Sequence, residues 1–487
     1  MLKILFVSSE VHPFIKTGGL ADVSASLPHA LAELGHDVRI LMPGYADALE
    51  QATDAAAEPD WTSPLEGGPT RLLRTPLPES GVPVWMLESA GFSDRPGNPY
   101  LGADGHPHPD NAFRFDLLGR AATAIAGDRG GLEWQPDVVH CNDWQTGLVP
   151  VRMLQHRAPG ATVYTIHNLA YQGLFPAETF QALGLPDWLW TMDGLEFHGQ
   201  MSFMKGGAAF ADRLTTVSPS YAAEIRTLAH GWGLEGLFNQ RAEHLVGILN
   251  GIDRRYWDPQ TDPYLYAPYS RQDLSGKAVN KARVQAELGL PEAPEKPLVA
   301  VITRLADQKG IDLILNALPD LRSRGLQVAI LGKGDRTYER SLEAVARHHP
   351  EQIGLHLGFD EGLAHRLEAG ADMLLMPSRF EPCGLNQLYS LAYGTIPVVR
   401  AVGGLADSVE DATPQAVASG RATGISFTGE TPAALVTAVE RALALYAEPE
   451  TWRRVQATGM AQDFTWERSA ARYVEVYEAA LADQKRV

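Results

Sequence analysis

The chain has 487 residues, which is too long for one ordinary hydrophobic core and predicts two or three domains. Hydrophobic residues make up 45% and charged residues 21%, as in typical globular proteins, and 41 Lys and Arg against 59 Asp and Glu give a net charge of −18. This charge argues against a general nucleic-acid binder, which needs a positive field, although it permits a local basic pocket.

Cysteine usage and the N-terminus indicate the compartment. Cys141 and Cys383 are too few for a disulfide scaffold and lack metal-ligand spacing, so a reducing cytoplasm is expected. The first apolar run stops at Ser8-Ser9-Glu10, which is too short for a signal peptide and predicts a buried strand. No apolar stretch is long enough to span a membrane. We therefore expect a soluble, cytoplasmic protein with no membrane partner.

Short aliphatic and β-branched runs alternate with helical segments along the chain, which is typical of parallel sheets covered on both faces. Two such series predict two doubly wound α/β domains. The expected strands are Lys3–Val7, Asp37–Met42, Val84–Leu87, Val138–His140 and Thr162–Ile166, then Leu298–Ile302, Gln327–Leu331, Gly354–Leu357, Met373–Met376 and Pro397–Val399. The expected helices include Ala21–Leu34, Asp312–Leu318 and Tyr338–His348.

The domain boundary is expected between Asn250 and Pro297, and we place the domains at residues 1–253 and 254–465. A stretch from Pro43 to Asp116 is rich in Gly, Pro and Asp, and we expect an irregular loop that covers an active site. In the C-terminal segment, Trp466, Tyr473, Val476, Tyr477 and Ala480 share one helical face. We expect a helix over 466–487 that joins the N-terminal domain.

Glycine and cationic residues follow strands in both halves. The segment Lys16-Thr-Gly18-Gly19 lies between a strand and a helix start, where backbone N–H groups favour a phosphate. By itself it also fits a tight turn with a solvated lysine. Arg304 and Lys309 follow the strand 298–302 and suit a departing diphosphate, or are ordinary surface cations.

The third cluster follows the strand 373–376. Glu381, before Pro382, is suited to holding sugar hydroxyls or stabilising an oxocarbenium-like carbon, or is a helix-start carboxylate. Cys383 alone is more typical of a small buried residue than of a nucleophile. A Gly-Gly-Leu-Ala-Asp sequence occurs at both 18–22 and 403–407, and it does not indicate duplication because its places in the two strand series differ.

Polar residues also follow two other strands of the first half. Asp143 and His167 suit contacts with a sugar, while Trp144 and Tyr171 suit stacking on sugar rings. A lone histidine is more often structural, but every cluster lies at the carboxyl edge of a predicted strand. This convergence from both halves predicts a site in a cleft between two domains.

Together these segments resemble the bacterial glycogen synthase and plant starch synthase family from Val7 to about Trp466. The segments that carry the resemblance are Lys16–Asp22, Asn142–Trp144, Thr165–Asn168, Asn250–Asp253, Arg304–Gly310 and Glu381–Leu385. The resemblance implies the GT-B fold, with two Rossmann-like domains facing each other across a deep cleft. It implies ADP-glucose as donor, the non-reducing end of an α-1,4-glucan (glycogen or a malto-oligosaccharide) as acceptor, retention of configuration, and neither a cofactor nor a metal ion.

The resemblance also implies roles for single residues. Arg304 and Lys309 would neutralise the departing ADP, and Glu381 would lie close to the transferred glucose. Asp143 and His167 would contact the transferred sugar and belong, with those three, to the expected catalytic set. The residues expected to bind substrates are Lys16, Gly18, Gly19, Asn168, Asn250, Cys383, Gly384 and Leu385. Gln145 departs from the family pattern, in which many relatives carry His. If that His places the acceptor, acceptor affinity is expected to differ, while the chemistry is expected to survive.

Three alternatives compete with this assignment. A UDP-glucose-dependent GT-B transferase with a small phosphorylated acceptor would need extra cations in the first half. A non-catalytic glucan-binding relative would lose the phosphate-handling residues, yet Lys16, Arg304 and Lys309 are all present. A glucan phosphorylase would need a pyridoxal-phosphate lysine and a longer chain.

Overall fold

A computed structural model describes every residue of the chain except 60, 62, 64, 66–68, 96 and 485–487. The chain forms two compact units: an N-terminal unit of Met1–Asn250 with the segment from Trp466, and a C-terminal unit of Gly251–Thr465. The chain crosses between them after Asn250, whereas we had placed the boundary after residue 253. Each unit is an α/β domain built on a largely parallel sheet, as the alternating pattern predicts.

The N-terminal unit contains a large sheet in the order β12-β11-β7-β6-β1-β2-β5-β4-β3. The strands from β12 to β5 are parallel, and β1 pairs with both β2 and β6. The strands are β1 (Lys3–Val7), β2 (Asp37–Pro43), β3 (Ala56–Ala57), β4 (Arg71–Pro76), β5 (Pro83–Glu88), β6 (Val138–Asn142), β7 (Ala161–Ile166), β11 (Arg213–Thr216) and β12 (Leu245–Gly247). A small antiparallel sheet contains β8 (Leu174–Pro176), β10 (Gln200–Ser202) and β9 (Glu196–Phe197).

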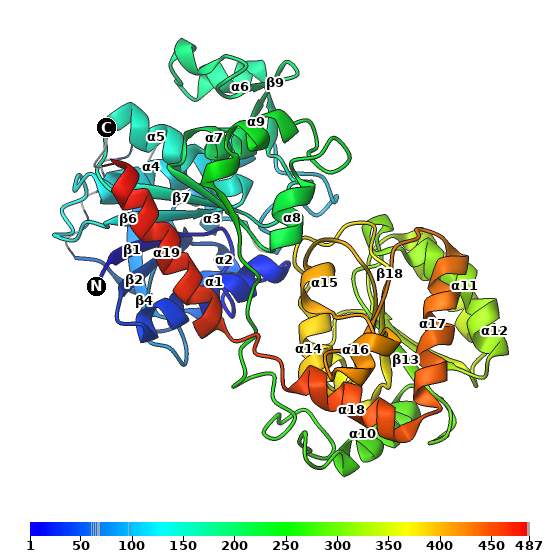
Figure 1. Cartoon of the computed structure of the whole chain (residues 1–487). Helices are drawn as coiled ribbons and strands as arrows, with labels where there is room; N and C mark the ends of the chain where they lie inside the picture. The colour runs from blue at the N-terminus through cyan, green and yellow to red at the C-terminus, as the bar shows by residue number, and fades with distance from the viewer. Residues whose placement is uncertain (60, 62, 64, 66–68, 96, 485–487) are drawn as a thin grey trace. The chain divides into compact units, whose positions relative to one another are not determined.

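Helices cover this sheet, and the C-terminal helix α19 packs against α1 and β7 (Figure 1). Its predicted face is buried, with Tyr473 and Tyr477 at 0% exposure, and the helix belongs to the N-terminal unit as predicted. Residues 485–487 of the predicted helix lie outside the described residues. The helices are α1 (Gly19–Glu33), α2 (Ala46–Gln51), α3 (Ala90–Ser93), α4 (Asn111–Ala126), α5 (Leu148–His156), α6 (Ala177–Ala182), α7 (Phe203–Phe210), α8 (Pro219–Glu224), α9 (Glu235–Gln240) and α19 (Trp466–Gln484), with 3₁₀ turns at Trp144–Thr146, Asp187–Leu189 and Ala242–His244.

The stretch from Pro43 to Asp116, expected to be irregular apart from the predicted strand Val84–Leu87, is largely regular. Strands β4 and β5 form an antiparallel hairpin that extends the sheet, and α2, α3 and α4 begin within the same stretch. The hairpin closes at Gly81, whose φ of 71° favours glycine, and Leu77 N–H donates to Val82 O at 2.8 Å. Residues 60, 62, 64, 66–68 and 96 of this stretch lie outside the described residues.

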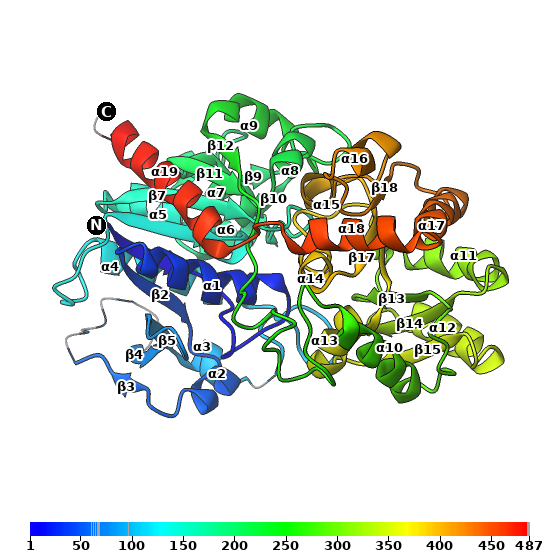
Figure 2. The same cartoon turned by 60° about the horizontal axis from the view of Figure 1, so that its bottom comes forward.

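The C-terminal unit contains a parallel sheet in the order β15-β14-β13-β16-β17-β18 (Figure 2). Successive residues of β13 point to opposite faces: Val299 and Val301 enter one apolar core, and Leu298 and Ala300 enter another. Both faces are therefore covered, which explains the continuous apolar strands. The strands are β13 (Leu298–Ile302), β14 (Gln327–Gly332), β15 (Ile353–Leu357), β16 (Met373–Met376), β17 (Ile396–Arg400) and β18 (Ile425–Phe427).

The helices of this unit cover the sheet, and those from α11 to α16 lie in the connections between successive strands. They are α10 (Ser275–Glu287), α11 (Ile311–Ser323), α12 (Arg336–His348), α13 (Glu361–Gly370), α14 (Asn386–Tyr393), α15 (Gly403–Ser408), α16 (Pro414–Ala418), α17 (Pro432–Tyr446) and α18 (Pro449–Met460), with a 3₁₀ turn at Asp307–Lys309. Each strand expected from the sequence is present in the two units, so this part of the prediction is confirmed.

Candidate functional site

The first candidate loop lies between β1 and α1 in the N-terminal unit, and it is organised by Glu10. The Glu10 carboxylate is buried and accepts hydrogen bonds from the Thr17 backbone N–H, from Thr17 Oγ1 at 2.6 Å, and from Tyr100 OH. Lys16 is partly exposed and its Nζ lies 2.8 Å from Asp22 Oδ1. Glu10 was not predicted as a residue of this loop, because in the sequence it marks only the end of an apolar run.

Gly18 precedes the first residue of α1 and has an extended backbone with φ −161°. A Cβ built at Gly18 would meet no heavy atom of the described residues within 4 Å. Neither backbone conformation nor packing within the unit therefore requires glycine here. A bare backbone at a helix N-terminus does suit the close approach of an anion.

The second candidate group comes from the ends of the neighbouring strands β6 and β7. Asp143 Oδ1 accepts the backbone N–H of His167 at 2.8 Å and that of Asn168 at 3.3 Å. Burial raises the pKa of Asp143 to about 7, although the two N–H donors oppose this shift. Asp143 also has φ 57°, an uncommon backbone conformation for a residue with a side chain.

His167 is held in one tautomer by Asn142. Asn142 Nδ2 donates to Val7 O at 3.0 Å, so Asn142 Oδ1 must accept from His167 Nε2, 2.9 Å away. Burial lowers the pKa of His167 to about 3, which keeps the ring neutral at neutral pH. Nδ1 is then the acceptor nitrogen, suited to a hydroxyl donor.

The aromatic residues expected to face sugar rings differ in exposure. Trp144 packs edge-on against Phe115 with ring centroids 5.1 Å apart, and a Cβ at Gly173 would lie 2.5 Å from its ring. Trp144 is therefore largely engaged in an aromatic cluster. Tyr171 is 51% exposed. Gln145 is buried, and its Oε1 has no hydrogen-bond partner among the described residues.

A buried histidine that sequence analysis did not single out connects α19 to the sheet. His140 Nδ1 lies 2.8 Å from Tyr477 OH, and Nε2 lies 2.6 Å from Thr165 Oγ1. Burial lowers the pKa of His140 to about 3. No local sequence signal marks this contact, because Tyr477 comes from the other end of the chain.

In the C-terminal unit, the loops after the paired strands β13 and β16 bring Lys309 and Glu381 together. Lys309 Nζ lies 2.6 Å from Glu381 Oε2, which also accepts from Ser378 Oγ at 3.0 Å. The Glu381 side chain is 7% exposed and that of Lys309 is 16% exposed. Arg304, in the same loop as Lys309, is exposed. Adjacent strand ends therefore combine two cations with one carboxylate.

The next residues lead into α14. Gly384 has φ 71°, a backbone conformation that favours glycine, and a Cβ there would lie 2.4 Å from Gln387 Oε1, at the end of a side chain. Cys383 is buried, and Leu385 directly precedes the helix. Asn386 Nδ2 donates to Ile302 O at 2.5 Å and holds the helix start against the end of β13. A helix N-terminus at this strand edge favours an anionic ligand.

The second Gly-Gly-Leu-Ala-Asp sequence supports the Glu381 loop from the start of α15. Gly404 N–H donates to Glu381 O at 3.0 Å. A Cβ at Gly403 would lie 2.0 Å from Glu381 O, and one at Gly404 would lie 2.0 Å from Cys383 O. These glycines permit backbone contact with the loop, a role that the sequence match alone did not indicate.

Asn250 ends the N-terminal unit; it is 5% exposed and its Oδ1 has no hydrogen-bond partner among the described residues. The predicted residues thus form two groups, Lys16 to Asn250 on one unit and Arg304 to Leu385 on the other. Their meeting in a cleft stays a prediction, as do their individual roles.

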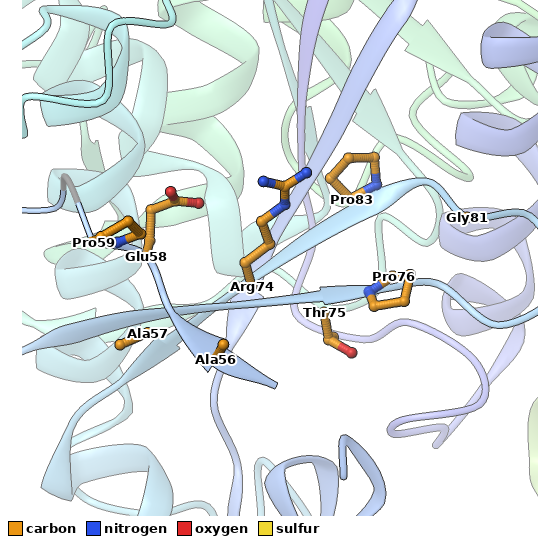
Figure 3. Close-up of a pocket in the computed structure, with 9 residues that line it drawn as sticks. All are labelled: Ala56, Ala57, Glu58, Pro59, Arg74, Thr75, Pro76, Gly81 and Pro83. Atoms are coloured by element: carbon orange, nitrogen blue, oxygen red, sulfur yellow. The ribbon is translucent and has the colours of Figure 1, made fainter. Parts of the chain in front are cut away.

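A separate pocket of about 300 Å³ lies at the β3–β5 edge of the N-terminal unit, where Figure 3 shows the charged side chains Glu58 and Arg74. None of the predicted site residues, all of which the structure describes, lines it. Within the described ranges, no group of three His, Cys, Asp or Glu residues is placed to hold a metal ion. None of the described helices is long and apolar enough to cross a membrane.

Comparison with protein families gives two matches in chain order. The family described as starch synthase catalytic domain matches residues 3–240, and glycosyl transferases group 1 matches residues 287–456. The chain is 56% identical over 482 residues to glycogen synthase 1 of Methylococcus capsulatus, covering 99% of this chain and 97% of that protein. It is 54% identical over 481 residues to the glycogen synthase of Thioalkalivibrio sulfidiphilus, covering 98% and 99%.

Among solved structures, the catalytic domain of starch synthase IV from Arabidopsis thaliana, bound to ADP and acarbose, matches with a TM-score of 0.89. It is 32% identical and the match covers 99% of each chain. A sucrose-phosphate synthase from Thermosynechococcus elongatus, 19% identical with a TM-score of 0.61, shares the fold alone.

Two parallel-sheet units with these neighbours define a GT-B glycosyltransferase, as the resemblance implied. The chain belongs to the glycogen synthase and starch synthase family, whose members it matches over nearly its whole length.

Proposed function

We propose that the protein is a glycogen synthase that transfers glucose from ADP-glucose to the non-reducing end of an α-1,4-glucan, with retention of configuration. The observation that carries the proposal is the meeting of Lys309 with Glu381, at 2.6 Å, at adjacent strand ends of the C-terminal unit. A cation beside a carboxylate suits a reaction in which an anionic diphosphate leaves a sugar that becomes positively charged.

We assign the donor-handling roles to the C-terminal unit. As the bond between the anomeric carbon and the diphosphate oxygen breaks, negative charge grows on the ADP, and Arg304 and Lys309 stabilise it. Glu381 lies beside Lys309 and stabilises the positive charge at the anomeric carbon. The backbone at Cys383, Gly384 and Leu385 holds the phosphates at the start of α14, where the helix dipole favours an anion.

We assign contacts with the transferred sugar and the acceptor to the N-terminal unit. His167, kept neutral by burial, accepts a hydrogen bond from a sugar hydroxyl through Nδ1. Asp143 and Asn168 fix the same strand end through the bond between the Asp143 carboxylate and the Asn168 N–H. The other residues of this unit that we assign to substrate contacts are Asn250 and the loop that contains Lys16, Gly18 and Gly19.

The choice of donor nucleotide rests on similarity. The Arabidopsis thaliana starch synthase IV domain, which is 32% identical over 99% of this chain, is bound to ADP and acarbose. This supports an adenine nucleotide and an oligosaccharide acceptor here. We further propose that turnover needs no resident metal ion and that the enzyme acts in the cytoplasm. We expect a metal chelator to leave turnover unchanged. We expect the enzyme to be recovered in the cytosolic fraction of cells.

The decisive experiment measures nucleotide release from ADP-glucose and from UDP-glucose, each with and without glycogen. We expect glycogen-dependent release of ADP well above that of UDP. Preference for UDP, or release indifferent to glycogen, would keep the fold and assign another acceptor. Glycogen binding without release from either donor would indicate a non-catalytic relative.

A further inference from the structure

Arg379 belongs to the loop after β16 but is bonded mainly to the loop after β13. Its backbone N–H donates to Gln308 O at 2.8 Å, and its Nη1 donates to Asp307 O at 2.6 Å. Gln308 Nε2 in turn donates to Phe380 O at 3.1 Å. The two loops that carry Lys309 and Glu381 are therefore tied together by contacts around Arg379.

The same guanidinium anchors this pair of loops to the rest of the unit. Nη1 and Nη2 of Arg379 donate to the two carboxylate oxygens of Asp312, in the first turn of α11, at 2.8 and 2.9 Å. Nε donates to Glu430 Oε1 at 3.0 Å. The hydrogen bonds from Arg379 lower the pKa of Asp312, so this carboxylate stays ionised and paired.

Arg400, at the end of β17, fixes the backbone on which Arg379 sits. Its Nη1 donates to Ser378 O at 3.2 Å and to Arg379 O at 2.7 Å, and its Nη2 lies 3.3 Å from Glu430 Oε2. Ser378 is the residue whose hydroxyl donates to Glu381. The position of the Glu381 carboxylate therefore depends on a peptide that the two arginines hold.

We propose that Arg379 is a positioning residue that sets the distance between Lys309 and Glu381. This inference rests on the proposed function of that site. Arg379 does not act as a further phosphate cation, because its Nε and both terminal nitrogens are engaged with Asp307, Asp312 and Glu430. These three acidic residues also offset its charge.

Arginine is required because the contacts need a planar fork. A guanidinium can chelate Asp312 with two parallel bonds while a third nitrogen reaches Glu430 and one N–H reaches the Asp307 carbonyl. A lysine ammonium supplies the same charge as a single point and cannot make all of these bonds. Arg379→Lys therefore separates geometry from charge.

The test compares Arg379→Ala and Arg379→Lys with Arg324→Ala. Arg324 is a matched control because it also pairs with two carboxylates, Glu440 and Asp320, but at the opposite end of α11. We expect both Arg379 variants to lower kcat for glycogen-dependent ADP release by about 10²-fold, as for a reacting group misplaced by about 1 Å. We expect their donor KM to stay within about threefold of wild type, and Arg324→Ala to match wild type.

Hydrogen exchange supplies a readout that does not depend on turnover. In Arg379→Ala, amides of residues 304–310 and 378–384 are expected to exchange faster together, and Arg324→Ala should leave both segments unchanged. Full activity in Arg379→Lys would overturn the inference in favour of charge alone. Faster exchange confined to 378–384 would also overturn it. If wild type released no nucleotide, the proposed function would fail, and the exchange data would still decide the role of Arg379.

Discussion

Replacing Gly403 with alanine is expected to lower turnover as well as stability. Gly403 opens α15 with φ 45°, and a Cβ at this position would lie 2.0 Å from Glu381 O, whereas real Cβ atoms essentially never approach closer than 3.0 Å. The neighbouring atom is backbone and cannot rotate away. The carbonyl of Glu381 must therefore retreat by at least about 1 Å, and its carboxylate moves with it.

Two magnitudes follow from this geometry. An L-residue forced into the left-handed region costs about 1–2 kcal/mol of folding free energy. A displacement of about 1 Å at the reacting centre lowers kcat by about 10²-fold, which corresponds to about 2.7 kcal/mol of activation free energy. Gly420→Ala is the matched control, because Gly420 has φ 68° in the same unit and its Cβ would meet no heavy atom of the described residues within 4 Å.

The assay combines thermal unfolding with kcat for glycogen-dependent ADP release. We expect both variants to lose stability, Gly403→Ala the more because its Cβ also displaces a backbone carbonyl, and only Gly403→Ala to lose turnover. If kcat of Gly403→Ala lay within about threefold of that of Gly420→Ala, the loop would not need its position and the reasoning would be refuted.

Three further outcomes are expected from the site and its surroundings. Arg304→Ala and Lys309→Ala should each lower kcat by about 10²–10³-fold, since each meets charge that grows in the transition state, and near-wild-type turnover in both would contradict these roles. His140, whose pKa burial lowers to about 3, must stay neutral in the folded protein, so its contribution to stability is lost as pH falls below about 6.5, by about 1.4 kcal/mol per pH unit. Between pH 7 and pH 5 the urea midpoint of unfolding should therefore fall less in His140→Gln than in wild type. Equal falls in the two proteins would count against a neutral, buried His140. Burial raises the pKa of Asp143 to about 7, so ionisation of this carboxyl destabilises the folded state as pH rises from about 4 to 7. The stability of Asp143→Asn relative to wild type should therefore increase across that range and stay constant above it. If the difference in unfolding free energy between the two proteins did not change between about pH 4 and pH 7, the raised pKa of Asp143 would be rejected.

Several elements were predictable because their physical cause is local. Leu298–Ile302 is an uninterrupted apolar run and forms β13 with the predicted bounds, since a strand covered on both faces buries residues that point to either side. The C-terminal helix was predictable from the period of Tyr473, Val476 and Ala480. Short strands such as β11 and β18 were missed, because Arg213-Leu-Thr-Thr and Ile425-Ser-Phe carry too few residues for a periodic signal.

The candidate residues were found for the same kind of reason. In a parallel sheet the carboxyl ends of all strands lie at one edge, so polar residues just after apolar runs are expected to gather there. Lys309 and Glu381 follow β13 and β16, which proved to be neighbours. The sequence by itself thus determined the two largely parallel sheets, the strand ends at which the candidate residues lie and, through the motifs together, the family.

Tertiary structure alone decided which distant groups support those residues. Glu10 holds Thr17 with the help of Tyr100, ninety positions further along the chain, and His140 meets Tyr477 near the other terminus. Arg379 binds the neighbouring loop, and Gly403 makes room for the Glu381 carbonyl. Such contacts join segments far apart in sequence, so no local period or motif reports them. They depend on how the strands are ordered in the sheet, which places the supporting residues beside a site that the sequence could only outline.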